Sequence, residues 1–210
     1  MYSVIHEQKN YNLSMGRSRE FDTDVALDAA IETFWRHGFE ATPMQDLCRS
    51  MDLGPGSIYA AFGDKRGLFH KALRRYMKTV STQAVERING ASSGLEGIRG
   101  YFEHLVNTMV DGKRQWGCLM TNSVVEFASR DPELAVLFQL HLARLETAFS
   151  AALSRARFAG ELRPEVGPEA AVLLVAVVQG MNVMAKTRPG RTALEGIVES
   201  VIIGLALQQL

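Results

Sequence analysis

The chain has 210 residues, of which 47% are hydrophobic and 22% are charged, a composition typical of a soluble globular protein. It excludes a wholly disordered or collagen-like chain. The 23 basic and 23 acidic residues cancel, so the net charge gives no indication of a nucleic-acid partner.

The start of the chain shows no hydrophobic periodicity. Residues 1–15 are therefore expected either to form a flexible arm or to precede a translation start at Met15 rather than at the first methionine. Beyond them, apolar residues recur at helical spacing and almost nowhere at strand spacing, which predicts an all-α chain. The first helix is expected over about 23–36, with Asp22 or Thr23 as its cap.

Two short helices joined by a glycine-containing turn are expected next. Thr42 as N-cap and Gln45 three residues later form a capping box, which opens the first of them. A turn at 52–54 then leads to a helix over 55–62, which begins with a proline. This pattern is a helix-turn-helix.

The fourth helix begins after Asp64 as its cap and carries a concentration of positive charge. Between residues 65 and 78 there is no acidic residue, so phosphate groups would experience a local basic stripe. The stripe consists of Lys65, Arg66, Lys71, Arg74, Arg75 and Lys78.

A Gly-Ala-Ser-Ser-Gly stretch at 90–94 marks the expected boundary between this front part and the remainder. Further helices are expected at 95–110, 119–129, 132–158, 168–186 and 193–208, about nine in all. The last is expected to begin with a second capping box, from Thr192 to Glu195. The longest apolar run, Ala170–Val178, is too short to span a bilayer, so we expect a cytoplasmic protein without a membrane.

The last two expected helices carry apolar stripes that are unfavourable in water. Buried pairing with a second copy around a two-fold axis is the usual solution, so we expect a homodimer. The predicted interface consists of Leu174, Val178, Val198, Val201, Ile202 and Leu205.

Motifs for catalysis, cofactors and metals are missing from the sequence. There is no G-x-S-x-G elbow, phosphate loop, dinucleotide fingerprint or H-E-x-x-H pair. The five histidines are scattered, and the two cysteines predict neither a disulfide framework nor a zinc site. We therefore expect no enzyme, no cofactor and no metal.

The segment from Gly16 to Val80 resembles the TetR-type bacterial transcriptional regulators. The resemblance lies in Ala41–Cys48 and in Met51–Phe69, which contain the small-residue, hydroxyl, aliphatic, tyrosine, then Phe-x-x-Lys pattern of that family's helix-turn-helix. It implies a homodimer that binds double-stranded operator DNA and releases it when a small molecule occupies the C-terminal part. Alanines at 60 and 61 depart from many relatives, which have polar or aromatic side chains there.

This resemblance divides the chain into four parts. Residues 1–15 are the arm, 16–63 the helix-turn-helix DNA-binding domain, 64–90 a connecting helix, and 91–210 a ligand-binding and dimerisation domain.

Several polar residues of the front part are candidates for DNA contact. Hydroxyl groups on the third helix can reach phosphates or base edges in a major groove, and basic residues before the first helix can follow the minor groove. The alternatives are that the tyrosine is a core-edge aromatic and that the arm's charges only aid solubility. The candidate DNA-binding residues are Arg17, Arg19, Thr42, Gly56, Ser57, Tyr59 and Lys65.

Large apolar side chains with interspersed polar groups in the C-terminal part can either line an effector pocket or form an ordinary core. The candidate pocket residues are Phe102, His104, Met109, Trp116, Met120, Glu126, Phe127, Phe138 and His141.

Cys118 lies at an expected helix start, where a thiolate is favoured. Together with Lys186 it resembles the branch of the family that includes regulators responding to electrophiles and oxidants, although a buried structural cysteine is the alternative. The leading hypothesis is a ligand-controlled repressor. The other hypotheses are a redox or electrophile sensor acting through Cys118, an interaction protein with a purely structural helix-turn-helix, and an unrecognised enzyme.

Overall fold

The computed structural model describes residues 21–112, 116–127 and 130–207. These residues form nine α-helices and one short 3-10 helix, which confirms the all-α prediction. The helices are α1 (Thr23–His37), α2 (Met44–Met51), α3 (Pro55–Phe62), α4 (Lys65–Asn89), α5 (Gly94–Val110), α6 (Leu119–Phe127), α7 (Pro132–Phe158), α8 (Ala170–Met184), η2 (Ala185–Thr187) and α9 (Arg191–Leu205).

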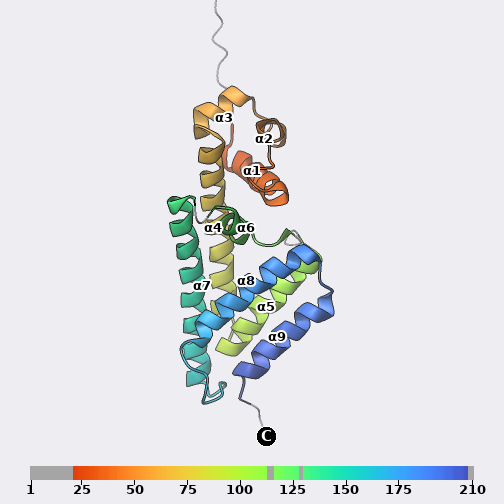
Figure 1. Cartoon of the computed structure of the whole chain (residues 1–210). Helices are drawn as coiled ribbons and strands as arrows, with labels where there is room; N and C mark the ends of the chain where they lie inside the picture. Colours follow the sequence, from red (N-terminus) through yellow and green to blue (C-terminus); the bar gives the residue numbers. More distant parts are fainter. Residues whose placement is uncertain (1–20, 113–115, 128–129, 208–210) are drawn as a thin grey trace, which may run out of the picture.

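The molecule is elongated, with α1, α2 and α3 gathered at one end of the long helix α4 (Figure 1). We call these three helices the head. Helices α5 to α9 form the body, in which α7 runs beside α4 and the short α6 lies between the head and the rest of the body (Figure 1). Helix α4 contacts α1 and α7 extensively and so joins the two parts.

Three helix starts are held by aspartates, as short-range capping rules predict. Asp22 accepts hydrogen bonds from the first backbone amides of α1, Asp64 accepts one from Gly67 at 2.7 Å, and Asp131 accepts one from Leu134 at 3.2 Å. These bonds satisfy amides that have no partner within the helix.

Neither predicted capping box forms. Pro43 occupies the N-cap position of α2, and the buried Thr42 hydroxyl instead donates to the carbonyl oxygen of Gly38 at 2.5 Å. Gly190, not Thr192, is the N-cap residue of α9. The Thr42 prediction was wrong because the turn after α1 encloses the side chain beside a carbonyl that needs a donor.

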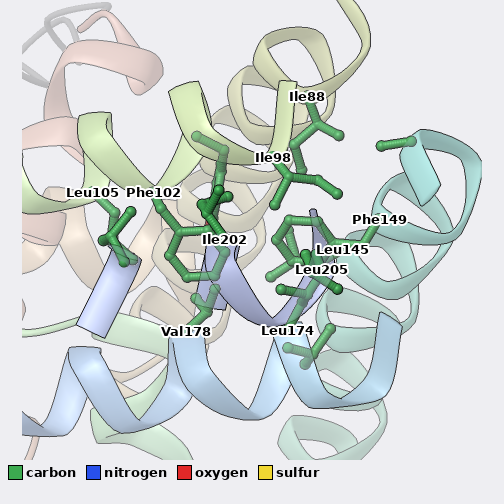
Figure 2. Packing of buried hydrophobic residues seen from close by; sticks show 14 of the residues in the cluster. Ile88, Ile98, Phe102, Leu105, Leu145, Phe149, Leu174, Val178, Ile202 and Leu205 are labelled. Carbon is green, nitrogen blue, oxygen red and sulfur yellow. The ribbon is translucent and has the colours of Figure 1, made fainter. Parts of the chain in front are cut away.

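Two hydrophobic clusters stabilise the molecule. One lies in the body between α5, α7, α8 and α9, and Figure 2 shows its side chains converging from these helices. The other lies in the head but includes Leu119 and Met120 of α6 and Leu134 and Leu137 of α7. The core of the head therefore extends into helices that belong by sequence to the C-terminal part.

Candidate DNA-binding surface and its connection to the body

The two short helices of the head are connected by a tight turn. Asp52 adopts a left-handed conformation, with φ of 52° and ψ of 41°, and the amide of Leu53 donates to the carbonyl of Cys48. Helix α3 then begins with Pro55 at its first position. This arrangement confirms the predicted helix-turn-helix.

Helix α3 presents one face to the core of the head and the other to solvent. Ile58 and Phe62 are buried, as their spacing predicts, whereas Gly56 and Ser57 are exposed and Tyr59 is 49% exposed. Because the inner face is anchored, the outer face is a rigid protruding surface of the size that enters a major groove. Gly56, Ser57 and Tyr59 are therefore all accessible, and their contact with DNA stays a prediction.

Thr42 does not belong to that surface. Its side chain is 0% exposed, and its hydroxyl is occupied by the carbonyl of Gly38, so no phosphate can reach it. Lys65 is half-buried, with Nζ 4.4 Å from the centroid of the Phe39 ring. Arg17 and Arg19 lie outside the described residues.

Three of the six residues in the basic stripe of α4 form ion pairs within the molecule. Arg66 lies 2.9 Å from Asp131, Arg74 lies 2.5 Å from Glu133, and Arg75 contacts both Asp24 and Asp28. The expectation of a stripe available to phosphates was therefore wrong for these three arginines. These pairs could not be seen from the sequence because the acidic partners lie far along the chain, two at the start of α7 and two in α1.

The Arg75 pair shows how strongly these charges are coupled. The two Asp28 oxygens accept from the guanidinium at 2.6 and 2.7 Å, a bidentate arrangement. These hydrogen bonds lower the pKa of Asp28 and raise the pKa of Arg75. The pair therefore ties α4 to α1 within the head.

The start of α7 is tied to α4 through a buried carboxylate. Oδ2 of Asp131 lies 2.9 Å from Arg66 and 2.9 Å from Nε2 of His70, whose Nδ1 lies 3.1 Å from Glu133. Burial alone would raise the pKa of Asp131, but the amide of Leu134 and the partners His70 and Arg66 together lower it. The carboxylate thus holds a charged junction between the connecting helix and the body.

Helix α6 contacts the turn that follows α1. The Glu126 carboxylate accepts backbone hydrogen bonds from Phe39 at 3.5 Å and Glu40 at 3.1 Å. Beside it, the rings of Phe39 and Phe127 pack edge to face with centroids 5.2 Å apart. Glu126 and Phe127 were predicted to line an effector pocket; Phe127 packs against the head, whereas Glu126 contacts the head and also lines a hollow between head and body.

Gly117 provides a second link between head and body. Its carbonyl accepts a hydrogen bond from Nε1 of Trp35 at 2.9 Å. Its φ is 79°, and a Cβ at this position would lie 2.6 Å from the carbonyl oxygen of Asn182. Only glycine fits such a close backbone approach in this conformation.

The remaining predicted pocket residues do not surround one cavity. Phe102 and Met109 are buried in the body cluster, Met120 and Phe138 belong to the head cluster, and His104 is half-buried on α5. These residues therefore do not line one common pocket. Apolar spacing identifies a buried face but not the cluster to which that face belongs.

His141 lies at a small cavity inside the body. Its Nδ1 is 2.8 Å from the Ser81 hydroxyl, and both residues are buried. The cavity has a volume of about 10 Å³, close to the minimum for one water molecule. Ser81 and Asn182 line it and were missed by the sequence analysis, although Ser81 visibly interrupts the apolar face of α4.

Cys118 lies at the same cavity and is 2% exposed. The Tyr76 hydroxyl donates to its sulfur at 3.7 Å. Lys186 is exposed and lines a different hollow. Burial removes the accessible thiol that an electrophile sensor needs and favours the structural alternative.

This burial predicts the reactivity of the two thiols. In a Cys48→Ala variant, Ellman's reagent should modify Cys118 slowly in the native protein and rapidly in urea, because reaction requires local opening. The half-buried Cys48 should react faster in a Cys118→Ala variant. Rapid native modification of Cys118 would contradict its assignment to the core.

A larger hollow of about 630 Å³ lies between the head and the body. Head residues Trp35 and Phe39 lie on one side of it, and Trp116, Glu126 and Lys186 line the other. We call it the head–body groove.

The outer face of α8 and α9 differs from the predicted dimer surface. Leu174, Val178, Val198, Ile202 and Leu205 are buried within the body, and Figure 2 shows four of them pointing toward the interior. Only Val201 of the predicted set is half-buried. Leu174 and Val178 lie on α8, which is apolar on nearly every side, so its periodicity does not distinguish the inward face from the outward one.

Other apolar residues of these helices face solvent. Leu173 is 62% exposed, and Val172, Val183 and Ile203 are exposed as well. A hollow of about 790 Å³ between α8 and α9 includes Leu173 and the small residues Ala193, Gly196, Ser200 and Gly204. The segment 170–187 also passes a length and composition test for a membrane span, but 44% of it is buried inside the molecule.

Comparison with known proteins agrees with this geometry. The model described as "Bacterial regulatory proteins, tetR family" matches residues 26–72, and "Tetracyclin repressor-like, C-terminal domain" matches residues 94–201. The uncharacterized HTH-type transcriptional regulator YezE of Bacillus subtilis (strain 168) is 39% identical over 151 residues, 72% of this chain and 78% of YezE. The HTH-type transcriptional repressor ComR of Escherichia coli (strain K12) is 29% identical over 175 residues, 82% of this chain and 83% of ComR.

A solved structure supports the same relationship. It contains a cysteine mutant of the TetR family transcriptional regulator CifR complexed with 26-base-pair double-strand operator DNA. The similarity has a TM-score of 0.78 and 28% identity and covers 89% of this chain and 98% of that chain. With its helix-turn-helix head, its helical body and both matching family models, this chain belongs to the TetR family of DNA-binding bacterial transcriptional regulators.

Proposed function

We propose that this protein is a cytoplasmic, ligand-responsive transcriptional repressor that binds a two-fold symmetric operator as a homodimer. The observation that carries the proposal is the anchored α3 helix, whose outer face presents Ser57 and Tyr59 to solvent. Repression is supported by the similarity to ComR, described as a repressor, and operator binding by the similarity to CifR in complex with DNA.

Helix α3 enters the major groove in this proposal. Hydroxyl groups of Tyr59 and Ser57 donate to phosphate oxygens or base edges, and Gly56 allows the backbone to approach. The exposed Ala60 contributes only apolar contact, for example with a thymine methyl. Lys65 adds a phosphate contact from the start of α4, and Arg17 and Arg19 follow the neighbouring minor groove.

Effector response requires that head and body move together. Helix α6 contacts the head through Glu126 and Phe127, and the Gly117 carbonyl binds Trp35. An effector that favours a different position of α6 therefore changes the separation of the two heads in the dimer. Converting 99% competent dimers to 99% incompetent ones requires about 5.5 kcal/mol of differential binding.

The DNA-contact assignment predicts the effect of three substitutions. Tyr59→Ala and Lys65→Ala should each weaken DNA binding roughly tenfold across many sequences, the effect of losing one good polar contact. Ser57→Ala should relax preference at one or two base pairs if the hydroxyl reaches a base. Fluorescence anisotropy with labelled DNA over a range of salt concentrations measures both effects.

Matched controls distinguish the loss of a DNA contact from the loss of the fold. Lys78→Ala removes an exposed lysine 13 positions further along α4, about 20 Å from Lys65, and should leave DNA affinity unchanged. Circular dichroism checks each variant's helix content. Unchanged affinity in the Tyr59→Ala, Lys65→Ala double variant would reject the assignment. Absence of salt-dependent DNA binding by the unmodified protein would favour an interaction protein with a structural helix-turn-helix.

A further inference from the structure

The head–body groove has the size and lining of a small-molecule site. Its volume of about 630 Å³ lies within the range of ligand pockets. It takes side chains from α1 and its following turn, from α6, and from the end of α8, so a bound molecule would touch head and body at once. By contrast, the buried cavity beside His141 has only about 10 Å³.

Aromatic rings form one part of the groove. Trp35 and Trp116 stand nearly perpendicular, at 75°, with ring centroids 6.1 Å apart. The Arg36 guanidinium lies 4.8 Å from the Trp116 centroid, a cation–π contact, while Phe34 and Phe69 also line the groove. These surfaces suit a flat apolar ring.

Positive charge lies at the end of α8. There the helix gives way to the short η2 turn, which places the exposed Lys186 and Arg188 in the groove lining. Among the residues that the structure describes, neither cation has an acidic partner within ion-pair distance. Both remain available to an anion.

The acidic lining residues do not cancel this charge. The Glu126 carboxylate accepts backbone amide hydrogen bonds from Phe39 and Glu40, so its charge is directed at the turn of the head. Glu40 is exposed and lies on the head side of the groove. The side formed by the end of α8 is therefore the side that attracts an anionic group.

We propose that the head–body groove binds a small planar aromatic anion. Its ring packs against Trp35 and Trp116, and its carboxylate or similar group meets Lys186 and Arg188. Such a ligand touches both parts and so stabilises this relative position of head and body over others. The proposed binding site does not depend on the proposed function. Only the expected effect of the bound anion on DNA affinity rests on that function.

The direct test uses 2-naphthoate as the anion and 2-naphthamide as its neutral counterpart, each titrated into the full-length protein by calorimetry. Naphthoate should bind about tenfold more tightly than naphthamide, the value of one charge-assisted contact. Because the chain contains only two tryptophans and both line the groove, binding should also change tryptophan fluorescence. Failure of naphthoate to bind, or equal affinity for both compounds, would overturn the proposal.

Variants locate the two parts of the site. A Lys186→Gln, Arg188→Gln double variant should lose about tenfold in naphthoate affinity and nothing in naphthamide affinity. Trp116→Ala should weaken both compounds, because it removes the ring surface that they share. Lys78→Gln is the matched charge control and should change neither affinity, and a naphthoate affinity unchanged in the double variant would contradict the assigned anion site.

A DNA-binding measurement distinguishes the groove site from its proposed effect on operator affinity. Saturating naphthoate should change operator affinity in the unmodified protein, and the Lys186→Gln, Arg188→Gln variant should need about tenfold more naphthoate for the same change. Naphthoate binding with unchanged operator affinity would overturn the regulatory consequence. Operator binding without naphthoate binding would overturn the groove site and leave the proposed function intact.

Discussion

Leu173→Asp is expected to convert the dimer into folded monomers. Leu173 is 62% exposed in the isolated chain and lies on the outer face of α8, beside the small residues of α9 that permit close helix approach. Pairing with a second copy would bury this side chain, and an unpaired carboxylate there is strongly unfavourable. We expect a loss of about 2 to 4 kcal/mol, roughly 30-fold or more in dimer dissociation constant, measured by sedimentation.

Two controls make this result specific. Val136→Asp places the same charge at an exposed apolar position of α7 and should leave the dimer intact. Ile202→Asp should unfold the protomer instead, because Ile202 lies in the body cluster. A Leu173→Asp protein that dimerises as tightly as the unmodified chain would show that the interface lies elsewhere.

Asp131→Ala is expected to destabilise the protein by about 2 to 4 kcal/mol. The change removes the N-cap of α7, which is worth about 1 kcal/mol. It also removes the buried partner of His70 and Arg66, although the high exposure of Arg66 reduces the contribution of that pair. Urea unfolding followed by circular dichroism measures the loss.

Asp131→Asn separates the charge from the cap, because asparagine is also a good N-cap residue. The folded structure lowers the pKa of Asp131, so the charge contributes fully above the unfolded-state pKa, near 4. This contribution is lost as the pH falls through the lower folded-state pKa. The stability difference between the unmodified protein and Asp131→Asn should therefore shrink below about pH 4, and an undiminished difference there would contradict the ionic role.

Short-range rules predicted most of the helices correctly. Helix α7 begins at Pro132 after the Asp131 cap and ends at Phe158, and α3 covers Pro55–Phe62, because caps, prolines and glycines act within a few residues. The helix-turn-helix and its exposed tyrosine follow from the same local patterns.

Contacts between distant segments could not be predicted in this way. Helix α8 is apolar on nearly every side, so its spacing did not reveal that Leu174 faces inward and Leu173 outward. Likewise, Arg66 and Asp131 are separated by 65 positions, and nothing local indicates that they pair. The head–body groove was missed because its tryptophans lie in different parts of the chain.

Selection of bound sequences from a random double-stranded DNA library, with the purified full-length protein, tests operator recognition most directly. The proposed dimer predicts enrichment of a two-fold symmetric site whose half-sites are about one duplex turn or slightly more apart, roughly 34 to 36 Å. Tyr59→Ala should reduce that enrichment, because α3 carries the contacts. Absence of any enriched sequence, or enrichment of a single half-site bound by a monomer, would contradict the proposed repressor.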